Sequence, residues 1–542
     1  MSAENGFFMC EAIRLIKIFL IKNGGLAMGT VDKLTELQYR RSVIEQGGGE
    51  AEIKKQHDAK KLTARERINA LTDDGSFVEI DAFVTHRAVE YGMDCTEAPG
   101  EGVVAGYGTV DGRPVYVYAQ DFTALGGSVG EMHSKKICKV MDMAAKTGTP
   151  VIGISDSSGA RIQEGTDALA GLGEILYRNT LNSGVVPQIS VVMGMCAGAA
   201  AASAALSDFV FMVENTGKMF MTGPQVIENA TGEKVDAAAF GGADVHSEKS
   251  GEVDFKAAND EECIAKVREL LSFLPSNNLE ETPYVPADDI NRVSERLTAI
   301  VPDDTTAAYD VRGVIAEIAD NGAFMEVQKD FAQNMVIGFA RMNGLTVGIA
   351  ANQPAVNDGL IDTYAAEKAA RFVRFCDSFN IPVVTFTDSE GFAASKAQEE
   401  SGLISSSAKL IYAFAEATVP KVNVIIRKAY GSAYIAMNSK NIGADMVLAW
   451  PTAEIAVMNP DGAANILFKD SLKNSSEPMS DREEKVQEYK NKAASPFEAA
   501  KRGYVDDVIE PDSTRPRIIA ALQMLEAKRE ARPAKKHGNI PV

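Results

Sequence analysis

The sequence predicts an α/β fold built from two tandem copies of one domain. Continuous apolar runs, rich in β-branched residues and bounded by Gly or Pro, are typical of strands buried on both faces of a sheet. Helical stretches separate these runs, and the same sequence blocks recur in the same order in the second half of the chain. A chain of 542 residues is also too long for a single hydrophobic core, so several domains are expected.

In the first half, strands are expected at 114–119, 150–155, 188–194 and 208–213. A helix is expected over Gly130–Gly148, with its final glycine as the residue that ends it. Thr63 and Glu66 have the spacing of a capping box and predict the start of an amphipathic helix.

In the second half, strands are expected at 346–351, 382–387, 421–426 and 445–450. The helix expected over Ala365–Asn380 is the counterpart of Gly130–Gly148. This alternation of strands and helices implies right-handed crossovers between parallel strands. The charged runs Lys469–Lys492 and Glu526–Lys536 are interpreted as solvated helix faces or tails.

Four pairs of sequence blocks indicate an internal duplication. The pairs are Asp73–Ile80 with Asp320–Val327, Val104–Val117 with Val336–Ile349, Thr149–Gly165 with Ile381–Gly402, and Val185–Ala201 with Thr418–Tyr434. Their spacing is far too long for a solenoid repeat. We therefore expect an N-terminal domain over 28–285 and a C-terminal domain over 286–542. Their join is expected near Ser272–Asp289, a stretch rich in Pro, Asn and acidic residues.

Residues 1–27 are treated separately from these domains. The apolar stretch 6–21 is interrupted by Glu11, Arg14 and Lys17. It is too short and too charged for a membrane span, and a signal peptide keeps its apolar core uncharged. A short amphipathic helix is one interpretation. The interpretation we favour is that translation starts at Met28 and that residues 1–27 are a non-native or flexible extension.

The composition excludes several classes of function. With 45% hydrophobic and 24% charged residues the chain is an ordinary globular protein, and its net charge of −20 argues against a nucleic-acid partner. The six cysteines contain no C-x-x-C pair, which fits a reducing, cytoplasmic location. Five histidines without metal-ligand spacing predict no metal site in this chain.

Small-residue turns follow two strands in each half. They read "SDSSGARIQEG" and "GMCAGAAAASAAL" in the first half, and "TDSEGFAAS" and "RKAYGSAYIAM" in the second. Gly and Ala let a ligand approach the backbone, and a helix that follows begins with unpaired N–H groups. Glycines that merely allow close packing would explain one such turn. Two adjacent turns, present twice, favour a pair of backbone oxyanion holes.

Conventional catalytic groups are scarce near these turns. Neither turn contains His, and no Ser-His-Asp order or Walker phosphate loop is present. The G-x-G-x-x-A match at Gly100–Ala105 follows no strand, so we reject it as a dinucleotide site. Chemistry that needs only stabilised oxyanions fits what remains, such as enolate formation from a thioester or transfer from a urea-like nitrogen.

From Thr30 to Val542 the chain resembles the carboxyltransferase subunit of biotin-dependent acyl-CoA carboxylases, decarboxylases and transcarboxylases. The motifs that carry the resemblance include "PGEGVVAGYGTVDGRPVYVYAQDFTALGGSVGEMH", "ARIQEG", "FMTGPQVI", "KAARFVRFCDSFNIPVVTFTD" and "AKLIYAFAEATVPKVNVIIRKAYGSAY". Propionyl-CoA carboxylase beta chains and methylmalonyl-CoA decarboxylase alpha chains are the most similar in their sequence motifs. The resemblance implies two tandem crotonase-like (ClpP/crotonase) domains, the first binding acyl-CoA and the second binding biotin.

The resemblance also implies roles for individual residues of the N-terminal domain. The backbone N–H groups of Ser158 and Gly159 would hold the oxygen of the thioester enolate. Gly198 and Ala199 would form the adjoining turn. Arg161, from the same motif, is assigned to substrate binding.

In the C-terminal domain, the resemblance implies that the N–H groups of Ser432 and Ala433 hold the ureido oxygen of biotin. Gly391 and Phe392 would supply the adjoining turn. Three further residues of the matched motif are assigned to substrate binding: Tyr430, Gly431 and Ile435. Ile435 is expected to line the acyl pocket.

The expected partners follow from the resemblance and from what the chain lacks. The family implies a ring-shaped homo-hexamer in which the acyl-CoA site of one subunit faces the biotin site of its neighbour. The sequence contains no A-M-K-M-like biotinylation motif and no ATP-binding loop. We therefore expect biotin on a separate carrier protein, supplied by a biotin carboxylase or coupled to a membrane sodium-pump decarboxylase subunit. A cytoplasmic location, with or without contact to a membrane partner, is expected.

Departures from the family pattern leave alternatives open. Glu390 stands where the family has Pro, and Ser405 and Ser406 replace an Arg-His pair. A divergent paralogue with an altered acyl substrate, or a non-catalytic hexameric scaffold, fits these changes. A biotin-independent crotonase-type hydratase or isomerase would need two acids, for which Glu131 and Glu164 are the candidates. Their surroundings resemble structural ion pairs, and the second half has no role in that scheme.

Overall fold

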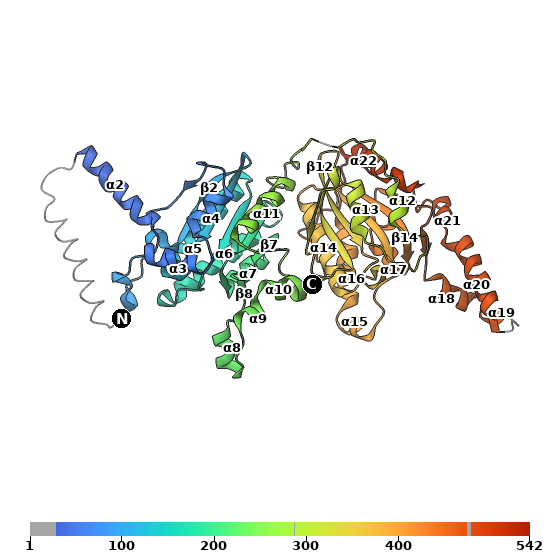
Figure 1. Ribbon diagram of the computed structural model, residues 1–542, viewed down its shortest axis with the longest axis horizontal. Helices are drawn as coiled ribbons and strands as arrows, with labels where there is room; N and C mark the ends of the chain where they lie inside the picture. Colours follow the sequence, from blue (N-terminus) through green and yellow to red (C-terminus); the bar gives the residue numbers. More distant parts are fainter. Residues whose placement is uncertain (1–28, 287, 474–477, 542) are drawn as a thin grey trace. The chain divides into compact units, whose positions relative to one another are not determined.

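The computed structural model describes residues 29–286, 288–473 and 478–541, which divide into two compact units (Figure 1). The first unit contains the described residues up to Ser183 together with Gln188–Ala243 and Ala257–Ala265. The second contains Gly184–Pro187, Asp244–Lys256 and the described residues from Lys266 onward. The N-terminal extension expected over 1–27 lies outside the described residues. The domain boundary expected between 285 and 286 stays a prediction. The second compact unit already includes the described residues from Lys266 onward.

The first sheet contains seven strands in the order β1-β2-β3-β4-β5-β7-β9. Strands β1, β2 and β3 pair antiparallel, and β3, β4, β5 and β7 pair parallel. The strands are β1 (Val78–Glu79), β2 (Val103–Val110), β3 (Arg113–Gln120), β4 (Val151–Ser155), β5 (Gln188–Val192), β7 (Phe209–Val213) and β9 (Phe255–Ala257). A separate pair consists of β6 (Met195–Ala197) and β8 (Lys218–Phe220).

The helices of this half begin with three that precede the sheet and continue with those that connect its strands. They are α2 (Thr30–Glu45), α3 (Glu50–Asp58), α4 (Ala64–Leu71), α5 (Glu131–Thr147), α6 (Thr166–Asn182), α7 (Ala199–Ala205), α8 (Pro224–Thr231), α9 (Ala237–Gly241), α10 (Ala243–Val245) and α11 (Asp260–Phe273). Helix α5 packs Ile137 and Met141 into a core shared with Val103 and Tyr116 of the sheet.

The second sheet repeats this plan in the order β10-β11-β12-β13-β14-β15-β17, with β16 beside β14. Strands β10, β11 and β12 pair antiparallel, and β12, β13, β14 and β15 pair parallel. The strands are β10 (Phe324–Val327), β11 (Met335–Met342), β12 (Leu345–Asn352), β13 (Val383–Ser389), β14 (Lys421–Tyr430), β15 (Met446–Ala449), β16 (Glu454–Ala456) and β17 (Asp507–Val508).

Helices cover both faces of the second sheet. They are α12 (Arg296–Ile300), α13 (Val311–Ile318), α14 (Thr363–Ser378), α15 (Lys396–Glu400), α16 (Leu403–Glu416), α17 (Gly431–Ala436), α18 (Pro460–Leu467), α19 (Lys469–Lys473), α20 (Pro478–Tyr489), α21 (Pro496–Lys501) and α22 (Thr514–Leu525). Phe372 of α14 packs on Phe339 of β11. Helices α13 and α22 share a core with Val336 and Ala340, which face the opposite side of β11 because side chains alternate along a strand.

The common order and direction of the strands confirm the predicted duplication. All eight predicted strand segments overlap observed strands: β3, β4, β5 and β7 in the first half, and β12, β13, β14 and β15 in the second. The predicted helices are α5, whose C-terminal Gly148 adopts φ +63°, and α14. The predicted capping box opens α4, where the Glu66 amide donates to Thr63 Oγ1 at 3.3 Å and the Thr63 amide donates to Glu66 Oε2 at 2.8 Å.

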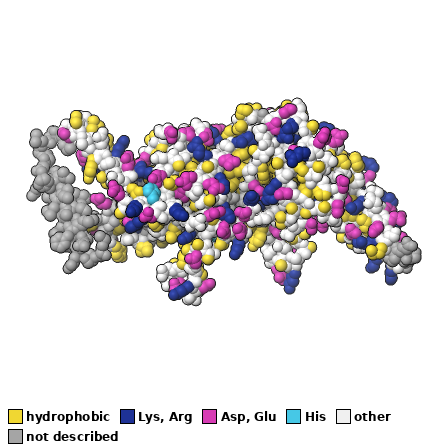
Figure 2. Space-filling view, viewed as in Figure 1, with side chains coloured by type: hydrophobic (Ala, Val, Ile, Leu, Met, Phe, Trp, Pro, Cys, Tyr) yellow, Lys and Arg dark blue, Asp and Glu magenta, His cyan; other side chains and the backbone are white. Residues whose placement is uncertain are grey.

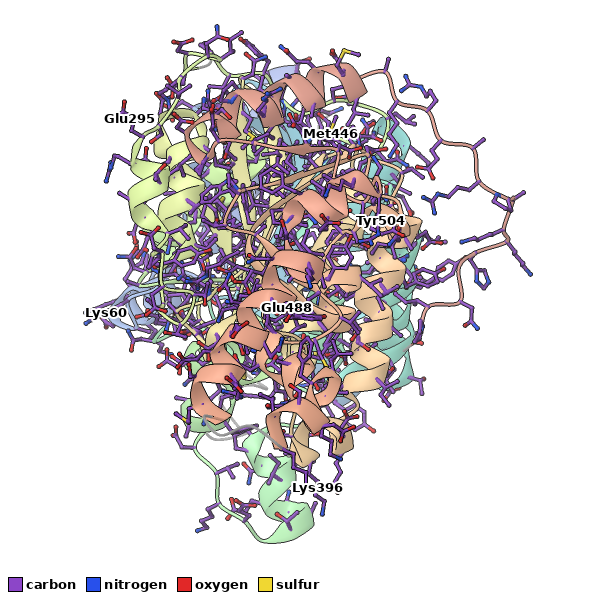
Figure 3. All side chains as sticks on the ribbon, turned by 90° about the vertical axis from the view of Figure 1, so that its right-hand side faces the viewer. Lys60, Glu295, Lys396, Met446, Glu488 and Tyr504 are labelled. Carbon is purple, nitrogen blue, oxygen red and sulfur yellow. The ribbon has the colours of Figure 1, made fainter. Side chains whose placement is uncertain are left out.

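The described part of the charged run Lys469–Lys492 forms helices that carry surface ion pairs, as predicted, while 474–477 lie outside the described residues. The second run, Glu526–Lys536, departs from the prediction at Lys528, whose side chain is 11% exposed and pairs with Asp445 at 2.8 Å. Glu488 of α20 (Figure 3) pairs with Lys485 at 2.7 Å and with Lys492 at 2.8 Å. On the face drawn in Figure 2, acidic and basic side chains are interspersed rather than gathered by sign. Among the described residues, no helix is both long enough and apolar enough to cross a membrane.

Candidate active site

Each unit brings a small-residue turn next to the start of a short helix. In the first unit the turn follows β4, and the Ser157 amide donates to the Met195 carbonyl at 2.8 Å, close to where α7 begins. In the second unit the turn follows β13, and Ser389 pairs with Ala429, just ahead of α17. Both arrangements lie at the carboxyl ends of adjacent parallel strands, where α/β proteins commonly bind ligands.

The first turn corrects the donors expected from the sequence. The Ser158 amide donates to the Gly126 carbonyl at 2.9 Å, and the Gly159 amide donates to Ser157 Oγ at 3.1 Å. Both N–H groups are therefore engaged within the protein. Gly159 instead gives the turn its shape, because its φ of +100° is a conformation that other residues rarely adopt.

The amide of Ala160 is the donor that this turn leaves open. Val129 bridges to the turn by donating to the Gly159 carbonyl and accepting from the Arg161 amide. This bridge turns the intervening Ala160 amide away from Val129, and it has no hydrogen-bond partner among the described residues. No local sequence signal marks this choice, because it depends on which residue of the turn faces Val129.

The start of α7 supplies further donors to the same site. The Gly198 amide is engaged with the Phe220 carbonyl at 2.9 Å, so the role of Gly198 is the φ of +64° that lets the chain enter the helix. Ala199 and Ala200 are the first two residues of α7, and N–H groups at such positions have no helical carbonyl partner. Ala199 was expected at this site, whereas Ala200 was not.

The second unit repeats this geometry. The Gly391 amide donates to Ser389 Oγ at 3.2 Å, and Gly391 adopts φ +144°. The Phe392 amide occupies the place of Ala160, since Ile361 bridges the turn through the neighbouring residues. No hydrogen-bond partner for the Phe392 amide is found in the described part of the chain.

Helix α17 begins directly after β14 and carries four of the expected residues. Gly431 opens it with φ +61°, and Ser432 and Ala433 follow as the second and third helical residues. Their amides belong to the first turn, which lacks helical carbonyl partners. Ile435, also on this helix, is 40% exposed and is free to contact a ligand.

Tyr430 is placed differently from the expectation. Its side chain is buried, and its hydroxyl donates to Glu454 Oε2. Burial and the neighbouring carboxylate raise the pKa of the Tyr430 hydroxyl well above its usual value. The assignment of Tyr430 to substrate binding stays a prediction, and the polar atom of this side chain is occupied within the protein.

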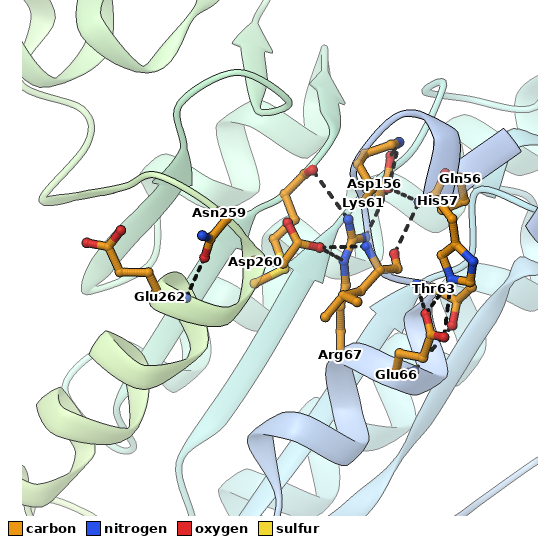
Figure 4. A network of polar contacts seen from close by, with 12 residues as sticks. Gln56, His57, Lys61, Thr63, Glu66, Arg67, Asp156, Asn259, Asp260 and Glu262 are labelled. Carbon is orange, nitrogen blue, oxygen red and sulfur yellow. Dashed lines mark hydrogen bonds and ion pairs between the residues drawn. The ribbon is translucent and has the colours of Figure 1, made fainter. Parts of the chain in front are cut away.

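A buried acid anchors the first turn (Figure 4). Asp156, immediately before Ser157, lies 3.0 Å from Lys61 Nζ and 3.0 Å from Arg67 Nη1. Gln56 Nε2 also donates to it at 2.8 Å, and Arg67 Nε continues the network to Asp260 at 2.7 Å. Charge-assisted bonds of this kind hold the turn in one geometry.

A second buried acid anchors the turn after β13. Asp388 accepts from Arg427 Nε at 3.1 Å and from the Tyr309 hydroxyl at 2.9 Å. The Lys428 amide donates to its other oxygen at 3.0 Å. Burial raises the pKa of the Tyr309 hydroxyl, which therefore remains a donor to this carboxylate.

Arg161 is also placed differently from the expectation. Its side chain is 2% exposed, and its guanidinium contacts Glu101, Glu164 Oε1 at 2.7 Å and the Ser128 carbonyl at 2.8 Å. A guanidinium enclosed in this way holds the turn from behind and does not face a ligand. The substrate-binding role expected for Arg161 stays a prediction, and the contacts observed for its guanidinium are structural ones.

The same network decides against the acid pair that a hydratase or isomerase would need. Glu164 is buried, pairs with Arg161 and accepts from the Glu131 amide at 2.7 Å. The side chain of Glu131 pairs with Lys135, which lowers the pKa of the Glu131 carboxyl. Both acids therefore form ion pairs, and Glu164 also accepts a hydrogen bond from the first amide of α5. Among the described residues, no cluster of three or more His, Cys, Asp or Glu could hold a metal ion.

Comparison with known proteins gives consistent matches over nearly the whole chain. The carboxyl transferase domain family matches residues 55–540. Methylmalonyl-CoA decarboxylase subunit alpha of Propionigenium modestum is 54% identical over 511 residues, covering 94% of this chain and 99% of that protein. The carboxyltransferase subunit of propionyl-CoA carboxylase of Haloferax mediterranei is 54% identical over 512 residues, with the same coverage of both chains.

A solved structure is similar over the same extent. It is the hexameric transcarboxylase 12S core with methylmalonyl-CoA and methylmalonic acid bound. The two chains superpose with a TM-score of 0.93 at 50% identity, covering 96% of this chain and 100% of the other.

Proposed function

The chain belongs to the carboxyl transferase domain family, and from that premise we propose that it transfers a carboxyl group between biotin on a separate carrier protein and the α carbon of a short acyl-CoA. Propionyl-CoA and methylmalonyl-CoA are the proposed acyl partners, because relatives that match 94% of this chain are named for them. The family and the fold expected from the sequence, two tandem crotonase-like domains, are confirmed.

The observation that carries the proposal is the repetition of one backbone arrangement in both units. Each unit joins a glycine turn to a helix start and leaves amide donors open at both. Carboxyl transfer involves two carriers of the carboxyl group, biotin and the acyl-CoA. Each carrier bears negative charge on an oxygen while the carboxyl group is detached, and the protein must stabilise both charges. Two matched sets of backbone donors fit two such carriers, whereas a single hydration or isomerisation would use one.

In the first unit, the proposed ligand is the thioester. When the carboxyl group leaves the α carbon as CO2, the electron pair of the broken bond moves onto the thioester oxygen. The amides of Ala160, Ala199 and Ala200 are proposed to donate to that oxygen. Fixed donors placed where charge develops commonly supply the largest part of such a rate enhancement, and no strong base is needed.

In the second unit, the residues fit the ureido group of biotin. The amides of Phe392, Ser432 and Ala433 are the open donors, and the adjoining Gly391 and Gly431 leave the backbone accessible. When bound, biotin would supply the ureido nitrogen that carries the carboxyl group. The protein's part is to hold the ureido oxygen through these amides and to place the nitrogen toward the acyl group.

The proposed assembly follows the hexameric relative. We propose a homo-hexamer whose acyl-CoA and biotin sites come from neighbouring subunits. Its proposed partners are a biotin carrier protein and either a biotin carboxylase or a membrane sodium-pump decarboxylase subunit. The direction of the reaction depends on which partner is present, and a cytoplasmic location stays a prediction.

The proposal is tested by following label from an acyl-CoA to biotin. The purified full chain is incubated with free biotin and methylmalonyl-CoA carrying isotope in its free carboxyl group. We expect label in the biotin fraction together with propionyl-CoA, and we expect added avidin to abolish the transfer. Label that remains on the thioester, or is released as CO2 at the same rate with and without biotin, would show that the chain does not catalyse this transfer.

A further inference from the structure

One ion pair beside the second turn is used neither by the backbone donors nor by the buried anchor. Lys428 Nζ on β14 lies 2.6 Å from Glu390 Oε1, which belongs to the residue immediately before Gly391. The lysine side chain is 6% exposed and the glutamate side chain is 34% exposed. Within the described residues, Lys428 Nζ has no other hydrogen-bond or ion-pair partner.

The carboxylate across from Lys428 in the strand pairing is already engaged. Glu454 lies across from Lys428 in the pairing of β14 with β16. It accepts from the Tyr430 hydroxyl and pairs with Lys490 at 2.7 Å. A lysine ammonium group has three N–H donors, so the single contact with Glu390 leaves two of them for a ligand.

The duplicated fold provides an internal comparison. In the first unit, the pairing of β6 with β8 places Met195 opposite Lys218, whereas in the second Lys428 stands opposite Glu454. Met195 therefore occupies the position of Lys428.

The turn residue next to this position also changes from neutral in the first unit to charged in the second. Ser158 takes the place of Glu390, since each follows the Asp-Ser pair that begins its turn and precedes the turn glycine. The backbone of the turn is thus the same in both units, but only the second places a lysine and a glutamate at these two positions.

This difference has no structural explanation. The first unit forms its turn with neutral residues at both positions, so the fold does not require the charges. Withdrawing a cation from water is costly unless its hydrogen bonds are filled, and a buried ion pair gives little net stability compared with apolar residues. A nearly buried ammonium with two unfilled donors, beside an open turn, is the environment expected for binding a small anion.

We propose that Lys428 binds the carboxylate that biotin carries, and that Glu390 forms an ion pair with Lys428 when that carboxylate is absent. This inference rests on the proposed function and names a side chain for the second site. The entering carboxylate accepts from the two free N–H groups of Lys428. Repulsion between the two carboxylates then moves Glu390, which is already partly in solvent, away from the lysine. The first unit has Met195 and Ser158 at these two positions, and its lysine, Lys218, stands instead at the place of Glu454. The second turn therefore selects the carboxylated ring, and the first selects the thioester.

The decisive experiment compares three variants of the full chain. Lys428→Met installs the residue that the first unit has at this position. Glu390→Gln removes the competing charge while keeping the length of the side chain. Lys409→Met is the matched control, because Lys409 Nζ also makes a single ion pair, 2.7 Å from Glu367, within the same unit.

Two readouts are combined. The first is binding of 13C-labelled bicarbonate, followed by the NMR line width of the anion in the presence of each protein without acyl-CoA. We expect Lys428→Met to abolish the broadening, Glu390→Gln to increase it about tenfold, and Lys409→Met to match the parent chain. The second is carboxyl transfer from methylmalonyl-CoA to biotin. Here we expect kcat to fall about 100-fold in Lys428→Met, as for loss of one donor to a developing charge, with KM for methylmalonyl-CoA unchanged.

The inference is overturned if Lys428→Met broadens the bicarbonate line as much as Lys409→Met does, or if it transfers carboxyl groups at the parent rate. The two readouts separate this inference from the proposed function. A parent chain that transfers no label contradicts the proposed function, yet its bicarbonate binding still decides whether Lys428 is an anion site.

Discussion

Asp156 and Asp388 occupy the same position in the two units, but each is neutralised by different parts of the chain. Each is buried, and each precedes the serine whose Oγ accepts from the turn glycine. Asp156 pairs with Lys61, which lies just beyond the end of α3, and with Arg67, which lies in α4. Asp388 pairs with Arg427 of its own sheet. The duplicated turns therefore share the same anchor, although the cations that hold it come from different elements.

The first prediction concerns Asp156. Asp156→Asn leaves Arg67 buried without this counter-charge, and the loss of one partner from a buried pair commonly costs roughly 3–5 kcal/mol. Urea unfolding followed by a probe in the first unit measures the loss. Asp81→Asn is the control, because Asp81 pairs with Lys139 at the surface, where such pairs contribute about 0–1 kcal/mol. Equal losses in the two variants would contradict the anchoring role.

The second prediction concerns the helix-start donors of α17. Ser432→Pro removes one N–H group, and proline is tolerated in the first turn of a helix. We expect kcat for carboxyl transfer to biotin to fall about 100-fold, as for loss of one oxyanion donor. Ser432→Ala keeps the N–H group and is expected to retain activity. If both variants behave alike, the Ser432 amide is not a donor to the reacting group.

Much of the fold could be predicted because it is encoded locally. The strands over 383–389 and 421–430 contain the runs of apolar and β-branched residues at 383–387 and 424–426, and every residue in both strands is buried. The capping box at Thr63 and the C-terminal glycine at Gly148 mark helix ends through residues a few positions apart. Duplication then allowed each half to support the interpretation of the other.

The site could be predicted only in outline, since its details depend on residues far apart in the sequence. Nothing near Ser158 shows that the Gly126 carbonyl takes its amide, or that Val129 leaves Ala160 open. Arg161 lies in a matched motif, yet its partners Glu101 and Ser128 come from earlier loops. The turns can be predicted because they are encoded locally, whereas the choice of donors cannot, because it depends on tertiary contacts.

The third prediction separates the structural role of Arg161 from the substrate role first expected. Arg161→Lys keeps a positive charge but loses the forked contacts with Glu164 and the Ser128 carbonyl. We expect a loss of about 1–3 kcal/mol in stability, from buried groups left without partners. We also expect KM for methylmalonyl-CoA to stay unchanged. A variant of parent stability with a raised KM would return Arg161 to the list of ligand contacts.

A buried histidine links the first turn to acid sensitivity. His133 is fully buried, with Nδ1 2.9 Å from the Glu101 carbonyl and Nε2 3.3 Å from Gln120 Nε2. A carbonyl only accepts and an amide nitrogen only donates, so Nδ1 carries the proton and Nε2 accepts. The site is thus built for the neutral ring, and burial lowers the pKa of His133 to about 3. Gln120 Oε1 in turn accepts from the Asp156 amide at the turn.

The fourth prediction follows from that pKa. The unfolded chain protonates this histidine near pH 6.5 and the folded chain only near 3, so the unfolded state binds more protons between these values. The contribution of His133 to stability is therefore present above pH 6.5 and is lost as pH falls, by at most about 1.4 kcal/mol per pH unit. Unfolding at pH 7 and pH 5 measures it. We expect His133→Gln to lose less stability between these pH values than the parent, and the exposed control His537→Gln to lose as much as the parent. An unchanged pH dependence in His133→Gln would show that this ring is not held neutral.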